Sequence, residues 1–195
     1  MCLTLPGPAW VFEQGLCNKF QDHGFNIRGV ERNLACYTQA VNSIKRVQRK
    51  LTNAFINMEG SCCTMQSVLS STQETYDLIY LDYCAAFVEK IEADLNLAFE
   101  RRLLNKGGYL GLTLECNQSC PNPRKPPRFR GLPIFITSHK TSKELERHKY
   151  RIHWVLQRVK KIASKHRIKL AVTKTSLYKE DGRARLMINL WFRIY

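Results

Sequence analysis

Hydrophobic residues in this chain occur in two patterns, short unbroken runs and longer segments with helical spacing. The clearest run is Leu78–Leu81 within YDLIYLD, which is too short for a helix and too continuous for a strand with one face in solvent. Such a run is typical of a strand buried on both faces of a parallel sheet. Comparable β-forming stretches predict further strands at residues 2–5, 25–30, 55–58 and 109–114.

The segments between these runs predict helices. In the segment 89–104, Ile91, Leu95 and Phe99 recur at helical spacing, and Gly107-Gly108 predicts the end of the helix. Three further helices are expected at residues 9–20, 33–50 and 64–69. A regular alternation of strand and helix indicates a parallel sheet with right-handed crossovers.

The last 80 residues break this alternation. Residues 116–141 are rich in Pro and Arg and lack periodicity, which predicts an extended basic arm. A capping box at 141–144 opens a helix to about residue 166, and strands at 168–178 and 183–194 flank a hairpin turn at 179–182. The predicted fold class is α/β, with a mostly parallel seven-stranded sheet, helices on both faces and a C-terminal antiparallel β-hairpin.

The net charge of +15 is divided unevenly along the chain. Residues 1–115 carry 11 Lys and Arg against 12 Asp and Glu, whereas residues 116–195 carry 20 against 4. The second part is therefore suited to a polyanion, and we expect nucleic acid, DNA or RNA, as the partner. A solvated loop with incidental charge is the alternative for the arm. The candidate contacts are Arg124, Lys125, Arg128, Phe129 and Arg130 in the arm, and Arg147, Arg151, Arg158, Lys161 and Lys165 on one helix face.

Eight cysteines are scattered through the chain, several of them inside apolar segments where a reduced thiol acts as a small hydrophobic group. The first residues lack the pattern of a secretory signal, and no apolar run reaches the roughly 18 residues of a membrane span. We expect an intracellular protein of the cytoplasm or nucleus, with free thiols and no membrane, and a virion as the alternative location. Cys116 and Cys120, with His139 nearby, form at most half of a zinc site, so no metal is expected.

Acidic residues follow two of the predicted strands. Asp82 ends the 76–82 run and Tyr83 follows it, and ligands of open α/β sheets bind beyond the carboxyl ends of strands. A helix cap or turn is the alternative role for Asp82. Glu31 follows the second strand 24 residues after Gly7, close to the spacing of an acid that binds ribose hydroxyls. The turn Pro6-Gly7-Pro8 links a strand to a helix and can aim backbone N–H groups at a ligand, or can be an ordinary turn.

On these residues the chain resembles the class I S-adenosylmethionine-dependent methyltransferases, whose Rossmann-like sheet ends in an antiparallel hairpin strand. The turn at Pro6 lies where that family's first loop touches the methionine part of the cofactor. Glu31 lies at its ribose acid, Gly60-Ser61-Cys62 at its adenine-side loop, and Asp82-Tyr83-Cys84 at its fourth motif. The resemblance implies catalytic roles for Asp82 and Tyr83. It implies S-adenosylmethionine binding by Leu5, Pro6, Gly7, Glu31, Ser61, Cys62 and Asp82.

We therefore expect one methyltransferase-like domain over residues 1–195, with a cofactor-binding half (1–115), a basic arm (116–141) and a basic helix with a terminal hairpin (142–195). The predicted function is S-adenosylmethionine-dependent methylation of nucleic acid. The fourth motif lacks the prolines of amino-methylating relatives. A non-catalytic nucleic-acid-binding or viral structural protein on the same scaffold is therefore the alternative, and another nucleotide ligand is a third.

Overall fold

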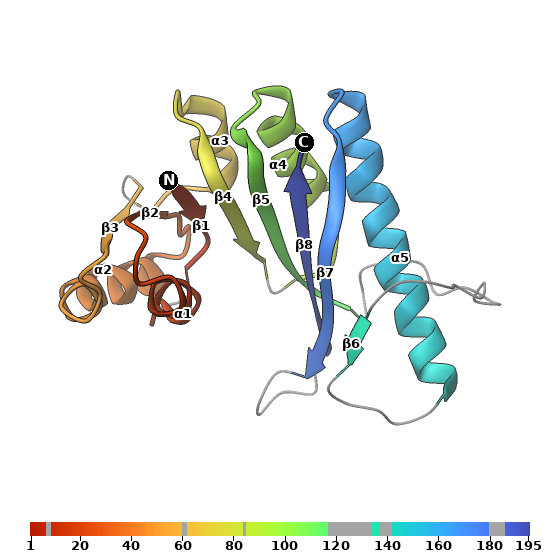
Figure 1. Cartoon of the computed structure of the whole chain (residues 1–195), viewed down its shortest axis with the longest axis horizontal. Helices are drawn as coiled ribbons and strands as arrows, with labels where there is room; N and C mark the ends of the chain where they lie inside the picture. Colours follow the sequence, from red (N-terminus) through yellow and green to blue (C-terminus); the bar gives the residue numbers. More distant parts are fainter. Residues whose placement is uncertain (7–8, 60–61, 84, 117–133, 137–141, 180–185) are drawn as a thin grey trace.

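The computed structural model describes residues 1–6, 9–59, 62–83, 85–116, 134–136, 142–179 and 186–195. An eight-stranded sheet in the order β3-β2-β1-β4-β5-β8-β7-β6 forms its centre (Figure 1). The strands are β1 (Cys2–Thr4), β2 (Phe25–Gly29), β3 (Ala54–Met58), β4 (Tyr76–Asp82), β5 (Leu104–Glu115), β6 (Ile134–Ile136), β7 (Leu170–Lys179) and β8 (Leu186–Ile194).

All neighbouring strands pair in parallel except β8, which is antiparallel to both β5 and β7. The mostly parallel Rossmann-like α/β fold and its C-terminal hairpin are therefore confirmed. The short strand β6 adds an edge strand beside β7, in a region where the sequence predicts only an extended arm. The strand order reverses between β1 and β4, and this reversal is the place where open α/β sheets bind ligands.

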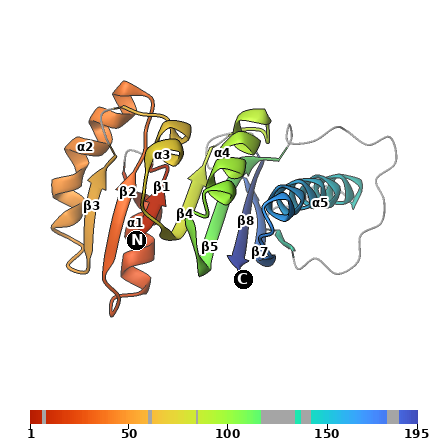
Figure 2. The same cartoon turned by 90° about the horizontal axis from the view of Figure 1, so that it is seen from above.

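Five helices pack on the sheet: α1 (Val11–Lys19), α2 (Leu34–Gln48), α3 (Met65–Ser71), α4 (Glu89–Glu100) and α5 (Ser142–Lys165). Helices α3, α4 and α5 bury one face in a large hydrophobic core with β4, β5 and β8. Helices α1 and α2 build a smaller core on the other face over β1, β2 and β3. Among the described helices none crosses this second face over β5, β8 and β7 (Figures 1 and 2).

Trp10, directly before α1, is fully buried and has a left-handed backbone with φ 53°. Its indole Nε1 donates a hydrogen bond to the carbonyl oxygen of Ala40 at 3.1 Å. A Cβ atom at Gly29 would lie 2.6 Å from the Trp10 ring and 2.7 Å from Pro6, so only glycine lets both side chains close over the end of β2. Helix α1 begins at Val11, two residues later than predicted.

The prediction that α4 runs to residue 104 and ends at Gly107-Gly108 is wrong. The helix ends at Glu100, and both glycines lie inside β5. Gly107 has a φ of +84°, and the pairing of β4 with β5 shifts register at this point. A Cβ atom at Gly108 would lie 2.8 Å from the carbonyl oxygen of Asp77. The glycines therefore permit a close approach of two strands.

Candidate functional site

A cavity of about 420 Å³ lies at the carboxyl ends of β1, β2 and β4, beside the point where the strand order reverses. Five residues that the sequence singled out line it: Leu5, Pro6, Glu31, Asp82 and Tyr83. The remaining walls include Arg32, Cys63, Met65, Lys90, Ile91 and Asp94. The structure thus brings together the ends of three strands with the first turns of α3 and α4.

Glu31 is held at the tip of β2 by the helix start that follows it. Its Oε1 accepts a hydrogen bond from the backbone N–H of Asn33 at 2.7 Å, and Asn33 in turn caps α2 by accepting from the N–H of Cys36. The second oxygen of Glu31 has no hydrogen-bond partner among the described residues. One carboxylate oxygen is therefore available to a donor in the cavity.

Tyr83 and Asp94, which both line the cavity, are joined by a hydrogen bond. The Tyr83 hydroxyl donates to Asp94 Oδ2 at 2.6 Å, while Asp94 Oδ1 is buried and has no partner among the described residues. Burial raises the pKa of the Asp94 carboxyl, and the Tyr83 hydrogen bond and Lys90 offset part of that rise. Burial and the Asp94 charge raise the pKa of Tyr83 well above its ordinary value, so the phenol stays protonated.

A second buried acid, Glu13, lies in the first turn of α1 and is only 1% exposed. Burial raises the pKa of its carboxyl, and the charge of Asp82 raises it further. The nearby Thr4 hydroxyl lowers this pKa, although neither that hydroxyl nor the Glu13 oxygens have a hydrogen bond of normal geometry among the described residues. Glu13 therefore stands close enough to Asp82 for the two acids to influence each other.

Some predicted site residues either do not line the cavity or lie outside the described residues. Cys62 has a left-handed backbone with φ 51°, and its thiol donates to the carbonyl oxygen of Arg32 at 2.9 Å, so Cys63 lines the cavity instead. Gly7 and Ser61 lie outside the described residues, as do Arg124, Lys125, Arg128, Phe129 and Arg130.

The basic residues predicted on α5 are in different environments. Arg147, Lys161 and Lys165 are exposed, and Arg151 is half-buried. Arg158 is engaged by α4, because its Nε and Nη2 both donate to Glu92 Oε1 at 2.9 and 2.5 Å. We conclude that Arg158 ties two helices together, whereas the exposed lysines remain candidates for contact with a polyanion.

Three residues of this region were not predicted from the sequence: Asp94, Glu13 and Lys90. Asp94 lies beside Ile91 and Leu95 on the apolar face of α4, and Glu13 lies in the first turn of α1 next to Phe12. A carboxylate within an apolar helical stripe is the signal that could have identified Asp94. Lys90 carries no such signal, because an exposed lysine in the first turn of a helix is ordinary.

The metal and membrane predictions can be compared with the described residues. These residues contain no group of three or more His, Cys, Asp or Glu side chains able to hold a metal ion. Cys120 and His139 of the half zinc site lie outside them, while the Cys116 thiol lies 3.6 Å from His148 Nδ1. No described helix is both long and apolar enough to cross a membrane.

No family model matches the chain, and no curated protein matches it in sequence. Solved structures do match it. Trm5b from Pyrococcus abyssi superposes with a TM-score of 0.56 at 14% identity, covering 99% of this chain and 43% of that protein. Magnesium protoporphyrin IX methyltransferase (ChlM) from Synechocystis PCC 6803, with bound SAH, gives 0.54 at 11% identity over 98% and 72% of the two chains.

A third match is TYW2 from M. jannaschii in complex with AdoMet, with a TM-score of 0.52 at 14% identity, over 100% of this chain and 68% of that one. The chain thus spans less than half the length of Trm5b and about two thirds to three quarters of the other two. These likenesses establish the fold: the chain has the class I S-adenosylmethionine-dependent methyltransferase architecture that its sequence resembles.

Proposed function

We propose that this protein is an S-adenosylmethionine-dependent methyltransferase that acts on nucleic acid. The observation that carries the proposal is the cavity at the strand-order reversal, which has an available carboxylate oxygen on Glu31 and a buried unpartnered oxygen on Asp94. Residues 1–115 form the cofactor-binding half in this proposal.

The residues of the cavity fit the cofactor. A volume of about 420 Å³ is within the range of small-molecule sites. Met65 and Ile91, which are 4% and 1% exposed, offer apolar surface to a base. Glu31 offers an acceptor for ribose hydroxyls, and Asp94 Oδ1 offers an acceptor for an N–H or O–H donor that reaches it.

The bound cofactor would supply an electrophilic methyl group on a sulfonium. The task of the chain is then to hold an acceptor atom in line with that group, because positioning supplies much of the rate of such a transfer. Asp82 lies at the end of β4 on the cavity wall and is our candidate for orienting the acceptor. The Tyr83 hydroxyl is committed to Asp94, so Tyr83 acts as a positioning residue for that carboxylate.

Nucleic acid is proposed as the substrate because of charge. Residues 116–195 carry 20 Lys and Arg against 4 Asp and Glu, and Arg147, Lys161 and Lys165 of α5 are exposed. A magnesium protoporphyrin IX methyltransferase shares the fold, so the fold by itself does not select the substrate. The charge distribution is what favours a polyanion.

Transfer of a radiolabelled methyl group from S-adenosylmethionine to RNA or DNA tests this function. We expect nuclease-sensitive label with the wild-type protein and a loss of about 100-fold or more with Asp82→Ala. Asp22→Ala, which changes an exposed acid on the loop after α1, is the matched control and should transfer label normally. Absence of label on both nucleic acids would contradict the proposed function.

A second candidate is a nucleic-acid-binding protein that does not catalyse transfer. It is favoured by the first loop, where Pro6 and Pro8 flank Gly7. Proline has no backbone N–H, so this loop can present fewer donors to a ligand than a glycine-rich loop. Nucleic-acid binding together with an absence of cofactor binding would select this candidate.

A further inference from the structure

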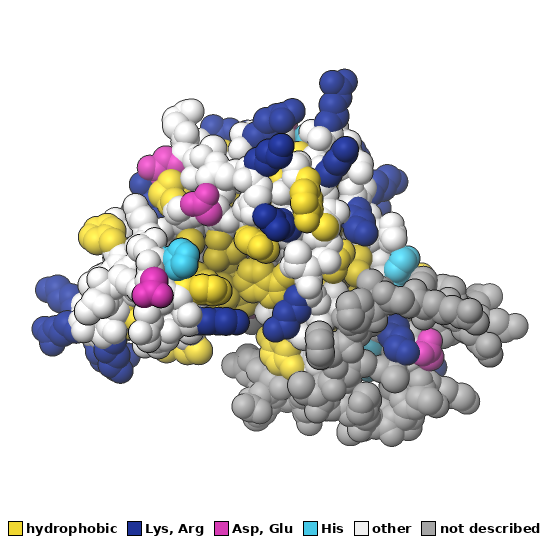
Figure 3. Space-filling view, in the orientation of Figure 1, with side chains coloured by type: hydrophobic (Ala, Val, Ile, Leu, Met, Phe, Trp, Pro, Cys, Tyr) yellow, Lys and Arg dark blue, Asp and Glu magenta, His cyan; other side chains and the backbone are white. Residues whose placement is uncertain are grey.

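The sheet face opposite α3, α4 and α5 is open over β5, β8 and β7, and aromatic side chains from several elements gather on it. Figure 3 looks onto this face and shows a hollow of hydrophobic side chains with Lys and Arg side chains around it. Contiguous apolar surface of this kind on a protein usually marks a binding surface. The rings and charged side chains of this face indicate the kind of partner that it binds.

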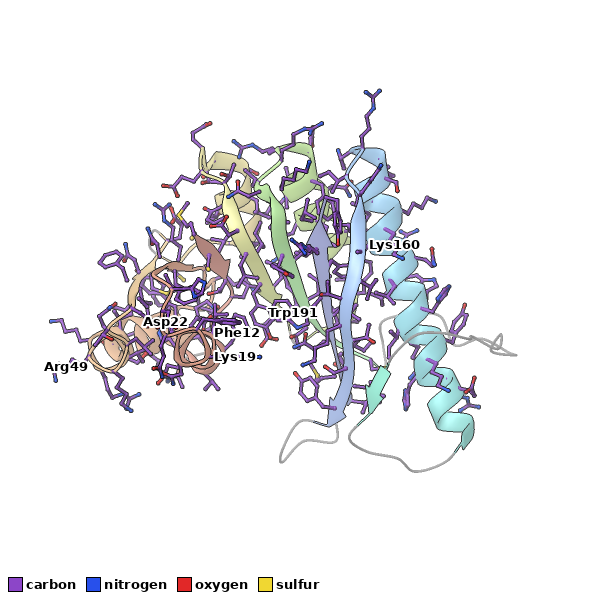
Figure 4. The ribbon with its side chains drawn as sticks, in the orientation of Figure 1. Phe12, Lys19, Asp22, Arg49, Lys160 and Trp191 are labelled. Carbon is purple, nitrogen blue, oxygen red and sulfur yellow. The ribbon has the colours of Figure 1, made fainter. Side chains whose placement is uncertain are left out.

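Three rings lie in the hollow. Phe12 of α1 stacks on Tyr80 of β4 with a centroid distance of 3.8 Å, and Trp191 of β8 lies 5.5 Å from Tyr80 at an angle of 9° (Figure 4). Gly111 of β5 makes this possible, because a Cβ atom there would lie 2.6 Å from Tyr80 and 2.9 Å from Trp191. Tyr80 is buried under Phe12, whereas Trp191 is only half-buried.

A second aromatic group continues along the same face toward the amino end of β5. Arg193 of β8 pairs with Tyr109 of β5, and its guanidinium lies 6.0 Å from the Tyr109 ring and 5.7 Å from the Tyr195 ring. Tyr109 and Tyr195 are 40% and 56% exposed. Residues 191, 193 and 195 point to one face because alternate residues of a strand share a face.

Basic side chains lie around the exposed rings of this face, and acidic side chains lie at one end of it. Lys174 of β7 pairs with Trp191, and it is exposed, as are Arg193 and Lys19. Lys19 follows Phe12 by seven residues and so lies on the same side of α1. Asp82 and Glu115 lie at the opposite, carboxyl end of β4 and β5. Cations therefore flank the exposed rings, and acids mark the end nearest the cavity.

We propose that this open sheet face binds a single-stranded segment of nucleic acid, with bases stacked on Trp191, Tyr109 and Tyr195 and phosphates held by Lys174, Arg193 and Lys19. A sheet that presents aromatic rings on neighbouring strands, bordered by Lys and Arg, is a general way to bind unpaired bases without reading them strictly. The inference deepens the proposed function and rests on its choice of nucleic acid as the substrate.

The face also connects to the proposed site of transfer. Tyr80 and Asp82 are two residues apart on β4 and lie on the same face of the sheet, so Tyr80 lies about 7 Å along the strand from the candidate orienting residue. A strand of nucleic acid lying across Trp191 would then lead one of its bases toward Asp82 and the cavity.

Fluorescence anisotropy of the full chain with fluorescein-labelled 12-nucleotide oligouridylate or oligothymidylate tests the proposal. Tyr109→Ala and Trp191→Ala are each expected to weaken binding about 5- to 100-fold. Trp191→Phe, which keeps a stacking ring, should restore most of the affinity. Phe55→Ala is the matched control, because Phe55 is 63% exposed on the edge strand β3, and it should bind as the wild type does.

Charge is tested by the pair Lys174→Glu and Arg193→Glu. This double variant should make the slope of log affinity against log salt concentration shallower, by the equivalent of about two phosphate contacts. The pair Lys45→Glu and Arg46→Glu on the exposed side of α2 changes the net charge equally and should leave the slope near the wild-type value.

Equal affinity of Tyr109→Ala and wild-type protein would overturn the proposal, and Tyr109 is exposed enough that this variant should fold even if Trp191→Ala does not. A wild-type dimer that Tyr109→Ala dissociates, with oligonucleotide affinity unchanged, would identify the face as a self-association surface instead. If the wild type binds neither oligonucleotide, the nucleic-acid part of the proposed function fails with this inference. If the protein binds no cofactor but its affinity for the oligonucleotide still falls when Tyr109 is replaced, the proposed nucleic-acid surface is supported.

Discussion

The Tyr83 hydroxyl donates a 2.6 Å hydrogen bond to Asp94 and so links the end of β4 to the buried side of α4. This bond satisfies one oxygen of a fully buried carboxylate and leaves the other buried and without a partner among the described residues, in a residue that lines the cavity. The pair therefore combines a structural role with the candidate binding role of Asp94.

Replacing Tyr83 by Phe should destabilise the fold. The substitution removes the donor to Asp94 Oδ2 and leaves both oxygens of that buried group unpartnered, at a cost of about 1–3 kcal/mol in the free energy of unfolding. Urea unfolding measures this change. Tyr109→Phe, which removes the hydroxyl of an exposed tyrosine, should change the free energy of unfolding by less than about 0.5 kcal/mol. A Tyr83→Phe protein as stable as the wild type would contradict this role.

Gly29→Ala should disturb the first loop. The added Cβ would lie 2.6 Å from Trp10, 2.7 Å from Pro6 and 2.8 Å from Met58, so side chains must move, at a cost of about 1–3 kcal/mol. Gly15→Ala is the matched control, because nothing lies within 4 Å of its Cβ and alanine favours the helix by up to about 1 kcal/mol. Thermal unfolding should move in opposite directions for the two variants. A Gly29→Ala protein that unfolds at the wild-type temperature or above would mean that the packing around Gly29 is not tight.

Glu13 should make stability depend on pH. Burial raises the pKa of its carboxyl above the ordinary value of 4.5, so the folded chain holds this proton more tightly than the unfolded chain. As the pH rises from 4.5 through the raised folded pKa, this group lowers the free energy of unfolding. Glu13→Gln removes the titration, so the variant should gain stability relative to the wild type over that interval.

Urea unfolding at a series of pH values measures this gain. Asn18→Gln, an exposed change in α1 that removes no titrating group, should show a constant difference from the wild type. A Glu13→Gln protein whose difference from the wild type is also constant with pH would show that burial does not perturb this carboxyl.

Arg158 and Glu92 should couple only weakly. Their side chains are 41% and 23% exposed, so a double-mutant cycle with alanine should give about 0.5–1 kcal/mol, falling as salt is added. Because Glu92 occupies the Arg158 guanidinium, Arg158→Ala should weaken the binding of a long nucleic acid that also reaches α5 less than Lys161→Ala, whose lysine is exposed. A larger loss with Arg158→Ala would return this residue to the nucleic-acid surface that the sequence predicted.

Much of the fold could be predicted because buried parallel strands have a distinctive pattern. The run Leu78–Leu81 and the acids that follow two strands could be recognised in the sequence. Parallel strands then bring their carboxyl ends to one edge of the sheet. That geometry explains why Glu31 and Asp82 line one cavity although 51 residues separate them.

The remaining features depend on tertiary contacts, and among them only Asp94, a carboxylate within an apolar helical stripe, carries a local signal. Gly107-Gly108 looks like the end of a helix, and only the approach of β4 shows that it serves a strand. The choice of Cys63 over Cys62 follows from the left-handed backbone of Cys62. Asp94 and Glu13 belong to helical stretches with mixed polarity, and their burial depends on the strands that they cover.

We propose above that the cavity holds S-adenosylmethionine or its demethylated product, and isothermal titration calorimetry with S-adenosylhomocysteine measures this binding. We predict saturable binding to the wild-type protein that Glu31→Gln weakens by about 10- to 100-fold, because a charged acceptor for hydroxyl groups is lost. Glu100→Gln should bind as the wild type does. Absence of heat at millimolar ligand, or equal affinity of Glu31→Gln and the wild type, would contradict cofactor binding in this cavity.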